Sequence, residues 1–194
     1  MKKILIINCH PNKESYNFAI VDAYKKGAKN SSDLIEEIVI ADLKFNPILE
    51  FGYQKRTELE PDLLIAWDKI KNAEHIVIVM PIWWGGIPGI AKCFFDRLFL
   101  PGMAFQYKEN SPWWDKLLKG KTAHIIVTMD TPAWFYRLIY SNAGIKQLKN
   151  NILNFCGIKV TKTTVISPIK NSTLNFRKNW LNKIEALAGL KETK

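Results

Sequence analysis

Three short apolar runs constrain the fold of this chain more than any other feature of its sequence. Residues Lys2–Asn8, His75–Met80 and Lys121–Thr128 are almost continuously apolar over the length of one strand each. Such runs are typical of parallel strands that helices cover on both faces of a sheet. We therefore place these three strands in the interior of a parallel sheet.

Two further segments of strand length are more polar. Leu34–Ala41 contains Glu36 and Glu37, and Ile158–Ile166 contains several lysines and threonines. Polar side chains are tolerated where a strand has an exposed face or lies at the edge of a sheet. We expect these two strands at the two edges.

Segments with helical spacing of apolar residues alternate with the strands. They are Tyr16–Ala28, Asp62–Asn72, Ile87–Leu98, Arg137–Phe155 and Thr173–Leu187. Because crossovers between parallel strands are right-handed, this alternation predicts an α/β fold, a doubly wound five-stranded parallel sheet of order 2-1-3-4-5 with helices on both faces. Residues 1–194 show no second domain boundary and are expected to form one domain. The long connections Asp42–Pro61 and Pro101–Gly120 are expected to shape a pocket or a dimer contact.

Composition excludes several classes of protein. No apolar run approaches the roughly 20 residues that span a bilayer, and polar Asn8 and His10 interrupt the first run, so we expect a cytoplasmic protein with no membrane span. The cysteines, Cys9, Cys93 and Cys156, form no pattern typical of a disulfide framework or a zinc site. The net charge is +10, but no nucleic-acid motif accompanies the dispersed lysines, so we expect no nucleic-acid partner.

The loop after the first strand, Cys9–Phe18, is a candidate ligand site. In a doubly wound sheet, ligands bind beyond the carboxyl ends of the strands. The loop contains neither a GxGxxG nor a Walker sequence, which disfavours a dinucleotide fold of Rossmann type and a nucleoside triphosphatase. Ser15 and Asn17 lie where the helix begins, and free N–H groups there form an anion site. Alternatively, Ser15 only caps the helix.

Aromatic residues follow the next two strands of the sheet. Trp83 and Trp84 precede two glycines that permit close approach of the backbone to a ligand. A flat ring system stacked here would account for these residues, although the tryptophans could instead pack against a neighbouring subunit. After Lys121–Thr128, Asp130 begins a turn, and Trp134–Tyr136 supply a second aromatic wall with one phenol.

The three histidines, His10, His75 and His124, lack the spacing of metal ligands. His75 and His124 open or enter strands. We therefore expect structural roles for these histidines and no metal site.

Several segments, taken together, resemble one known family. They are Ile4–Pro11 with Ser15–Asn17, Pro81–Gly85, Phe94–Arg97, Pro101–Phe105, Leu117–Lys121 and Phe155–Ile158. In this order and spacing they resemble the NAD(P)H:quinone oxidoreductase family of flavodoxin-like flavoproteins, from the first strand to the last. The resemblance implies a flavodoxin-like fold and a homodimer that shares its site across the interface. It also implies a ping-pong cycle in which the donor, NADPH or NADH, and a quinone-like acceptor occupy one pocket in turn.

The resemblance further implies a tightly bound flavin, FMN or FAD. Its phosphate contacts correspond to His10, Ser15, Asn17 and Phe18. Its isoalloxazine contacts correspond to Pro81, Ile82, Trp83, Trp84 and Gly85, and the third flavin loop to Thr128, Met129, Asp130 and Thr131. The chain is shorter than the animal enzymes, whose additional C-terminal region helps to bind the adenine half of FAD, and this favours FMN.

The chain departs from the pattern of the family in two places. Relatives carry Thr-Thr-Gly-Gly where this chain has Thr128-Met129-Asp130-Thr131. The pocket tyrosine of those relatives corresponds to Tyr136, but their histidine six residues later is Asn142. Because an amide does not transfer protons at neutral pH, Tyr136 or solvent must supply the proton. We assign Tyr136 as a hydrogen-bond donor to the bound acceptor.

The predicted activity is two-electron reduction of quinone-like acceptors by hydride transfer through the flavin. An azo- or nitroreductase would use the same flavin and differ only in its acceptor. The resemblance also includes flavin-binding regulatory subunits of potassium efflux systems. A single-electron carrier of flavodoxin type is disfavoured, because such carriers tend to be acidic and this chain is basic.

Overall fold

The computed structural model describes residues 2–29 and 33–189 of the 194-residue chain. Its main sheet has five parallel strands in the order β2-β1-β3-β6-β7. The strands are β1 (Lys3–Asn8), β2 (Leu34–Val39), β3 (His75–Pro81), β6 (Thr122–Thr128) and β7 (Lys159–Ile166). This order confirms the predicted order 2-1-3-4-5, and the two more polar strands form the edges.

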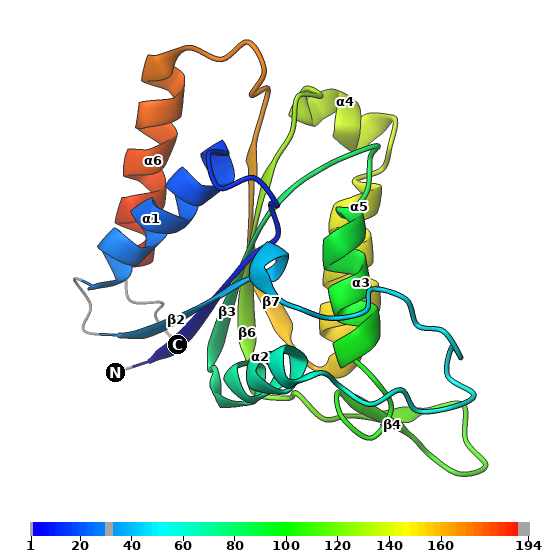
Figure 1. Cartoon of the computed structure of the whole chain (residues 1–194). Helices are drawn as coiled ribbons and strands as arrows, with labels where there is room; N and C mark the ends of the chain where they lie inside the picture. The colour runs from blue at the N-terminus through cyan, green and yellow to red at the C-terminus, as the bar shows by residue number, and fades with distance from the viewer. Residues whose placement is uncertain (1, 30–32, 190–194) are drawn as a thin grey trace.

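Helices cover both faces of the sheet (Figure 1). On one face lie α1 (Tyr16–Lys29) and α6 (Leu174–Gly189). On the other lie α2 (Pro61–Asn72), α3 (Gly89–Leu98) and α5 (Ala143–Lys146). Within the described part of the chain, no helix combines the length and the apolar character that crossing a membrane requires.

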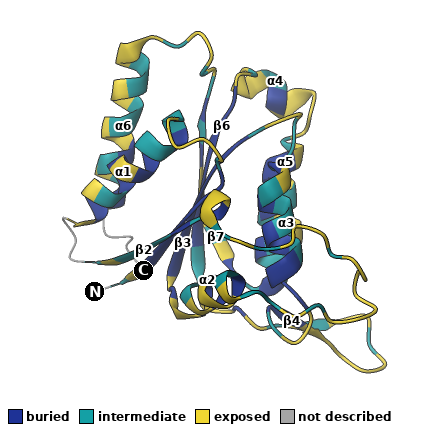
Figure 2. Cartoon of the chain, viewed as in Figure 1, coloured by how far each residue is buried: buried dark blue, intermediate teal, exposed yellow. Residues whose placement is uncertain are grey.

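The alternation of side chains along each strand divides the core into two clusters. In β1, Leu5 and Ile7 belong to the cluster under α2 and α3, whereas Ile4 and Ile6 belong to the cluster under α1 and α6. All four side chains are buried, and Figure 2 shows the same burial along the central strands. Burial on both faces explains why these strands are continuously apolar rather than alternating.

The segment predicted as one helix, Arg137–Phe155, is interrupted in the structure. Helix α4 (Ala133–Leu138) ends early, and Ser141 and Asn142 adopt left-handed backbone conformations with φ of 50° and 55°. Helix α5 then begins at Ala143 and continues as a π-helix, η2 (Gln147–Asn154). The prediction was wrong here because consecutive left-handed residues end a right-handed helix, whatever the spacing of the apolar residues.

The two long connections also contain order that the sequence did not reveal. Within Pro101–Gly120, β4 (Phe105–Tyr107) and β5 (Trp114–Lys116) form an antiparallel hairpin. A short 3-10 helix, η1 (Ile40–Asp42), follows β2 and begins the other connection.

One buried arginine fixes the first long connection against α3. Arg97 is fully buried and pairs with the carboxylate of Glu60 at 2.8 Å. Its guanidinium also donates to the backbone oxygens of Asn46 and Glu58. These contacts with three separate residues hold the loop in one position, since breaking any of them would leave a buried charge underpaired.

Candidate functional site

A cavity of about 180 Å³ lies at the carboxyl edge of the sheet, beside the ends of the neighbouring strands β1 and β3. Four loops form its wall, because the carboxyl ends of parallel strands meet at the same edge. The lining residues are His10, Ser15, Tyr16, Asn17, Pro81, Ile82, Trp83, Thr128, Met129, Asp130 and Ile169.

The cavity gathers nine of the thirteen residues that the resemblance assigns to a flavin. They are His10, Ser15, Asn17, Pro81, Ile82, Trp83, Thr128, Met129 and Asp130. Phe18, Trp84, Gly85 and Thr131 do not line it. Sequence reasoning missed Tyr16 and Ile169. The signal for Ile169 was its place just after the last strand, which also ends at this edge.

Two buried polar atoms in this cavity have no hydrogen-bond partner among the residues that the structure describes. They are Ser15 Oγ and Asn17 Nδ2, at the start of α1. The hydroxyl of Thr128 donates to Asn17 Oδ1 at 2.7 Å, so the amide is oriented and its Nδ2 remains available. Asn17 is only 2% exposed.

An oxyanion is the ligand that these two atoms fit. A buried donor without an acceptor costs about 1–3 kcal/mol, and an anion at the start of a helix also meets free N–H groups. The alternative that Ser15 caps α1 is not what the structure shows, because its Oγ makes no hydrogen bond to any described residue.

His10 contributes a neutral imidazole to the same cavity. Its Nδ1 accepts the backbone N–H of Asn12 at 3.0 Å, which leaves the ring proton on Nε2. Its ring lies nearly perpendicular to that of Trp83, with the two ring centroids 5.4 Å apart. Partial burial lowers the pKa of His10 below its ordinary value, because desolvation disfavours the charged form. At neutral pH, Nε2–H is therefore an uncharged donor.

A tight turn follows β3 beside the cavity. Trp83 and Gly86 exchange two backbone hydrogen bonds, of 3.2 and 2.9 Å. Between them, Trp84 and Gly85 have φ of 51° and 73°, and positive φ at both central residues is typical of a type I′ turn. A tryptophan in that conformation is uncommon, and its side chain is fully exposed. The turn thus exposes the side chain of Trp84 at the surface of the protein.

Tyr136 holds this turn in place from within the protein. The residue is 1% exposed, and its hydroxyl donates to Gly85 O at 2.9 Å and accepts the N–H of Gly144 at 2.8 Å. Burial raises the pKa of the phenol above its ordinary value. Donation to a bound acceptor, the role expected from the sequence, would require the hydroxyl to leave Gly85.

Asn142 lies close to this junction, at the position where relatives carry a histidine. Its backbone N–H donates to Tyr136 O at 3.1 Å. It precedes α5 in the left-handed conformation described above. The residue thereby shapes the turn that brings Gly144 to Tyr136.

The third loop is tied to the segment after β7. Asp130 Oδ1 accepts the backbone N–H of Lys170 at 2.7 Å, and Met129 O accepts that of Ile169 at 3.1 Å. These contacts occupy the loop in which relatives carry two glycines. They also explain how Ile169 reaches the cavity.

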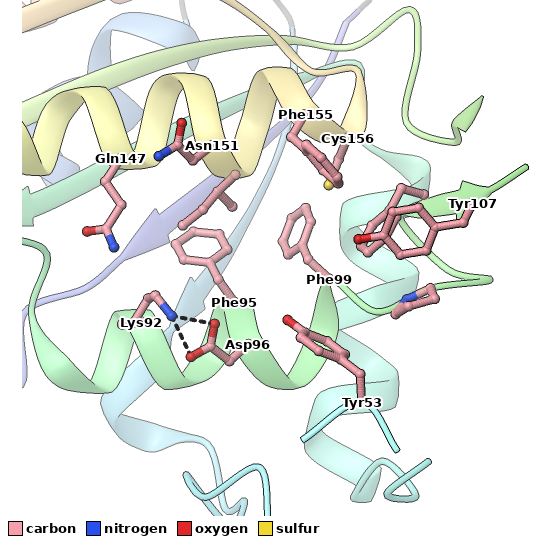
Figure 3. Close-up of a pocket in the computed structure, with 13 residues that line it drawn as sticks. Tyr53, Lys92, Phe95, Asp96, Phe99, Tyr107, Gln147, Asn151, Phe155 and Cys156 are labelled. Carbon is pink, nitrogen blue, oxygen red and sulfur yellow. Dashed lines mark hydrogen bonds and ion pairs between the residues drawn. The ribbon is translucent and has the colours of Figure 1, made fainter. Parts of the chain in front are cut away.

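A second cavity, of about 360 Å³, lies along the second half of α3 (Figure 3). Its aromatic lining consists of Tyr53, Phe95, Phe99, Phe105, Tyr107 and Phe155. Lys92 and Asp96 form an ion pair at 2.6 Å at one side, next to Gln147 and Asn151. Both long connections contribute to it, which confirms that they shape a pocket. None of the residues assigned to a ligand from the sequence lies in it.

The other two histidines and Cys9 are buried in the protein. His75 Nδ1 is 2.7 Å from Thr122 Oγ1, and His124 Nε2 is 2.9 Å from Thr164 Oγ1. Cys9 is buried, and burial raises the pKa of its thiol far above the ordinary range. The three cysteines are free thiols.

Comparison with known proteins identifies relatives across nearly the whole chain. The family profile described as flavodoxin-like fold matches residues 2–187. FMN-dependent NADH:quinone oxidoreductase 2 of Listeria innocua is 32% identical over 149 residues, which cover 65% of this chain and 68% of that protein. NAD(P)H dehydrogenase (quinone) 1 of Cavia porcellus is 26% identical, covering 99% of this chain and 76% of that protein. The crystal structure of Smu.1420 from Streptococcus mutans UA159 is 30% identical and superposes with a TM-score of 0.84, covering 96% of this chain and 98% of that one.

Proposed function

The chain belongs to the flavodoxin-like fold family, among the NAD(P)H:quinone oxidoreductases, and on that premise we propose that it reduces quinone-like acceptors through a bound flavin. The electrons would come from NADPH or NADH as a hydride. One observation carries this proposal: Ser15 Oγ and Asn17 Nδ2 are buried in the cavity at the carboxyl edge and have no partner among the described residues. A phosphate group supplies the acceptor oxygens that both atoms need.

We assign FMN rather than FAD as the cofactor. Ser15, Asn17 and the first N–H groups of α1 would hold the phosphate, with His10 Nε2–H as a further donor. Pro81, Ile82 and Trp83 would lie against the ring system. A relative whose name specifies FMN supports the choice.

When bound, the flavin supplies the hydride chemistry, so the task of the protein is to bind and orient. Tyr136 keeps Gly85 O fixed, and with it the turn that carries Trp84. Because its hydroxyl is occupied on both sides, we assign Tyr136 as a positioning residue. The proton that the acceptor takes up would come from solvent.

We further propose that the protein acts as a homodimer. The turn Trp83–Gly86 precedes α3, and the aromatic cavity lies along the second half of the same helix. A two-fold axis across the middle of α3 would bring each turn over the aromatic cavity of the other copy. Exposed aromatic side chains at both places support this arrangement: Trp84 is fully exposed, Tyr53 is 67% exposed and Tyr107 is 57% exposed.

The test is anaerobic reduction of the FMN-loaded protein by NADPH and by NADH, followed by addition of acceptors. The proposal expects the flavin absorption to bleach with at least one donor and to return with a benzoquinone or a naphthoquinone. Faster return with an azo dye or a nitroaromatic compound would favour the reductases of those classes. Flavin that binds but is reduced by neither donor would favour a regulatory subunit or an electron carrier.

A further inference from the structure

A small pocket, called the side pocket below, adjoins the aromatic cavity and has no part in the proposed function. Its volume is about 120 Å³, and the first long connection forms it against Leu100 and Pro101, just beyond the end of α3. Tyr53 and Pro101 line both the side pocket and the aromatic cavity, and Figure 3 shows Tyr53 in the latter. A ligand in the aromatic cavity therefore reaches the side pocket by passing Tyr53.

Two cations line the side pocket without a carboxylate to balance them. Lys55 and Arg56 are exposed, and no Asp or Glu is among the described residues of the lining. Neither cation takes part in an ion pair within the described part of the chain. Lys55 Nζ instead lies 4.9 Å from the centroid of the Phe51 ring. Glu50 and Glu58 flank this segment in the sequence but do not line the pocket, so the lining is positively charged.

Thr57 adds a buried hydroxyl to the same lining. Its Oγ1 has no hydrogen-bond partner among the residues that the structure describes. The chain is held in place directly after it, because Arg97 Nη2 donates to Glu58 O at 3.0 Å. An unpaired buried hydroxyl is costly, and an oxyanion is an acceptor that would satisfy it. The cations and the hydroxyl thus favour the same class of ligand.

A terminal phosphate group matches the side pocket in size and in charge. A volume of about 120 Å³ equals about four water molecules at roughly 30 Å³ each, which suits a phosphate group and is too small for a nucleotide. A phosphate monoester carries a charge of about −1.5 to −2 at neutral pH, and arginine binds phosphate oxygens in pairs. The phosphate of FMN is already assigned to Ser15 and Asn17. The side pocket therefore suits a second phosphate.

The two hydride donors differ by one group of this kind. NADPH carries a phosphate monoester on the 2′ position of its adenosine ribose, where NADH carries a hydroxyl. The pyrophosphate that both donors share fits the pocket less well. It is flanked by a ribose on each side, and each of its phosphorus atoms carries a single charge.

We propose that Lys55, Arg56 and Thr57 bind the 2′-phosphate of NADPH and make the protein prefer NADPH to NADH. The proposal rests on the proposed function and dimer, in which the nicotinamide enters the aromatic cavity beneath the turn of the other copy. The adenosine would then extend past Tyr53, whose ring is 67% exposed and offers a stacking surface for adenine.

The first test measures binding without turnover. Isothermal titration of the full-length, FMN-loaded protein compares adenosine 2′,5′-bisphosphate with 5′-AMP, which differ only in the 2′-phosphate. The bisphosphate should bind at least about tenfold more tightly. Lys55→Ala/Arg56→Ala should abolish this difference, and Thr57→Val, which keeps the shape of the side chain, should reduce it about threefold. The matched control, Lys162→Ala/Lys178→Ala, removes two exposed cations from β7 and α6 and should change the difference by less than about twofold.

The second test measures flavin reduction by the two donors under anaerobic conditions. The kcat/KM for NADPH should exceed that for NADH by at least about tenfold. In Lys55→Ala/Arg56→Ala this ratio should fall by at least about tenfold, whereas Lys162→Ala/Lys178→Ala should preserve it. A purely structural effect of the double variant would lower turnover with both donors and leave the ratio as it is.

Three results would overturn the proposal. The first is equal affinity for the bisphosphate and 5′-AMP. The second is displacement of the bisphosphate by inorganic phosphate at equal concentration, which would leave only a general anion site. The third is a rise of at least about tenfold in the Kd of Lys55→Ala/Arg56→Ala for FMN, which would assign the cations to the flavin of the other copy. Reduction of the flavin by neither donor would instead contradict the proposed function, and the nucleotide titration would still decide whether the 2′-phosphate is recognised.

Discussion

The two cavities of this protein differ in how their polar atoms are satisfied. At the carboxyl edge of the sheet, Ser15 Oγ and Asn17 Nδ2 are buried, and no described residue is their hydrogen-bond partner. In the aromatic cavity, Lys92 and Asp96 pair with each other, and no lining residue has a buried unpaired side-chain atom within the described structure. Native proteins rarely leave buried donors unpaired, which supports the proposal that the first cavity binds an anionic ligand. The aromatic lining of the second cavity suits a flat apolar surface instead.

Replacing a hydrogen-bond donor of the first cavity by a negative charge should have the largest effect, and that effect is on the affinity for FMN. Asn17→Asp replaces the unpaired Nδ2 donor by a carboxylate oxygen and should raise the Kd for FMN by about 100-fold or more, because like charges then face each other. Isothermal titration would measure it. Asn151→Asp makes the same change of charge in the aromatic cavity and should alter the Kd by less than about threefold. An equal loss of FMN affinity in both variants would contradict the distinction between the two cavities.

Removing the hydroxyl of Tyr136 tests the link between the first cavity and its turn. Tyr136→Phe removes both hydrogen bonds of the hydroxyl, although Gly144 N–H still donates to Gly85 O at 3.2 Å. The free energy of unfolding should therefore fall by about 0.5–1.5 kcal/mol in urea denaturation. Tyr140→Phe, on a half-exposed neighbour, should change it by less than about 0.5 kcal/mol. In turnover, Tyr136→Phe should keep the shape of the pH profile of kcat. A new pH dependence would instead return Tyr136 to the role of proton donor.

Truncating an aromatic side chain of the second cavity should weaken acceptor binding and leave FMN binding unchanged, whereas Asn17→Asp weakens FMN binding. Tyr107→Ala should raise the KM for a naphthoquinone by up to about tenfold, since an aromatic contact is worth about 0.5–1.5 kcal/mol. The Kd for FMN should stay the same. Trp113, on the same connection, lines neither cavity and provides the control. An equal rise in KM for Trp113→Ala would show that the aromatic cavity has no special part in acceptor binding.

The smallest expected effect concerns the pH dependence of the first cavity. Burial holds the pKa of free His10 below its ordinary value, whereas a bound phosphate would raise that pKa by stabilising the imidazolium. Binding would then take up a proton between these two pKa values, so wild-type affinity gains as the pH falls through that range.

His10→Gln keeps a donor but does not titrate. The Kd of the His10→Gln variant for FMN, divided by that of the wild type, should therefore increase about threefold as the pH falls from about 8 to about 6. Fluorescence titration at several pH values would measure this ratio. A ratio that does not change with pH would mean that His10 stays away from the phosphate.

The sheet could be predicted because its signals are local. Continuous apolar runs identified β1, β3 and β6 as interior strands, and Glu36 and Lys162 identified their segments as edges. The break at Ser141 and Asn142 could not be found in this way, because left-handed residues leave no trace in apolar spacing. Short strands such as β4 and β5 depend on contacts across the hairpin that no periodicity reports.

The residues of the candidate site also form two groups: those that local sequence signals could place, and those that depend on tertiary contacts. Residues that follow a strand directly, such as Ile82 and Met129, could be placed at the carboxyl edge from the order of the strands alone. The role of Tyr136 depends on its hydrogen bond to Gly85, 51 positions away in the chain, and could not be predicted. The aromatic cavity likewise gathers side chains from α3, η2 and both long connections. Only tertiary packing brings these segments together.

Titration of the purified wild-type protein with FMN, followed by quenching of flavin fluorescence, tests the central claim most directly. If Ser15 and Asn17 hold a phosphate, the titration should saturate at one FMN per chain, and riboflavin, which lacks the phosphate, should bind at least about 100-fold more weakly. Equal affinity for riboflavin and FMN would contradict the assignment of the phosphate site. Failure to bind FMN at all would contradict the proposed function itself.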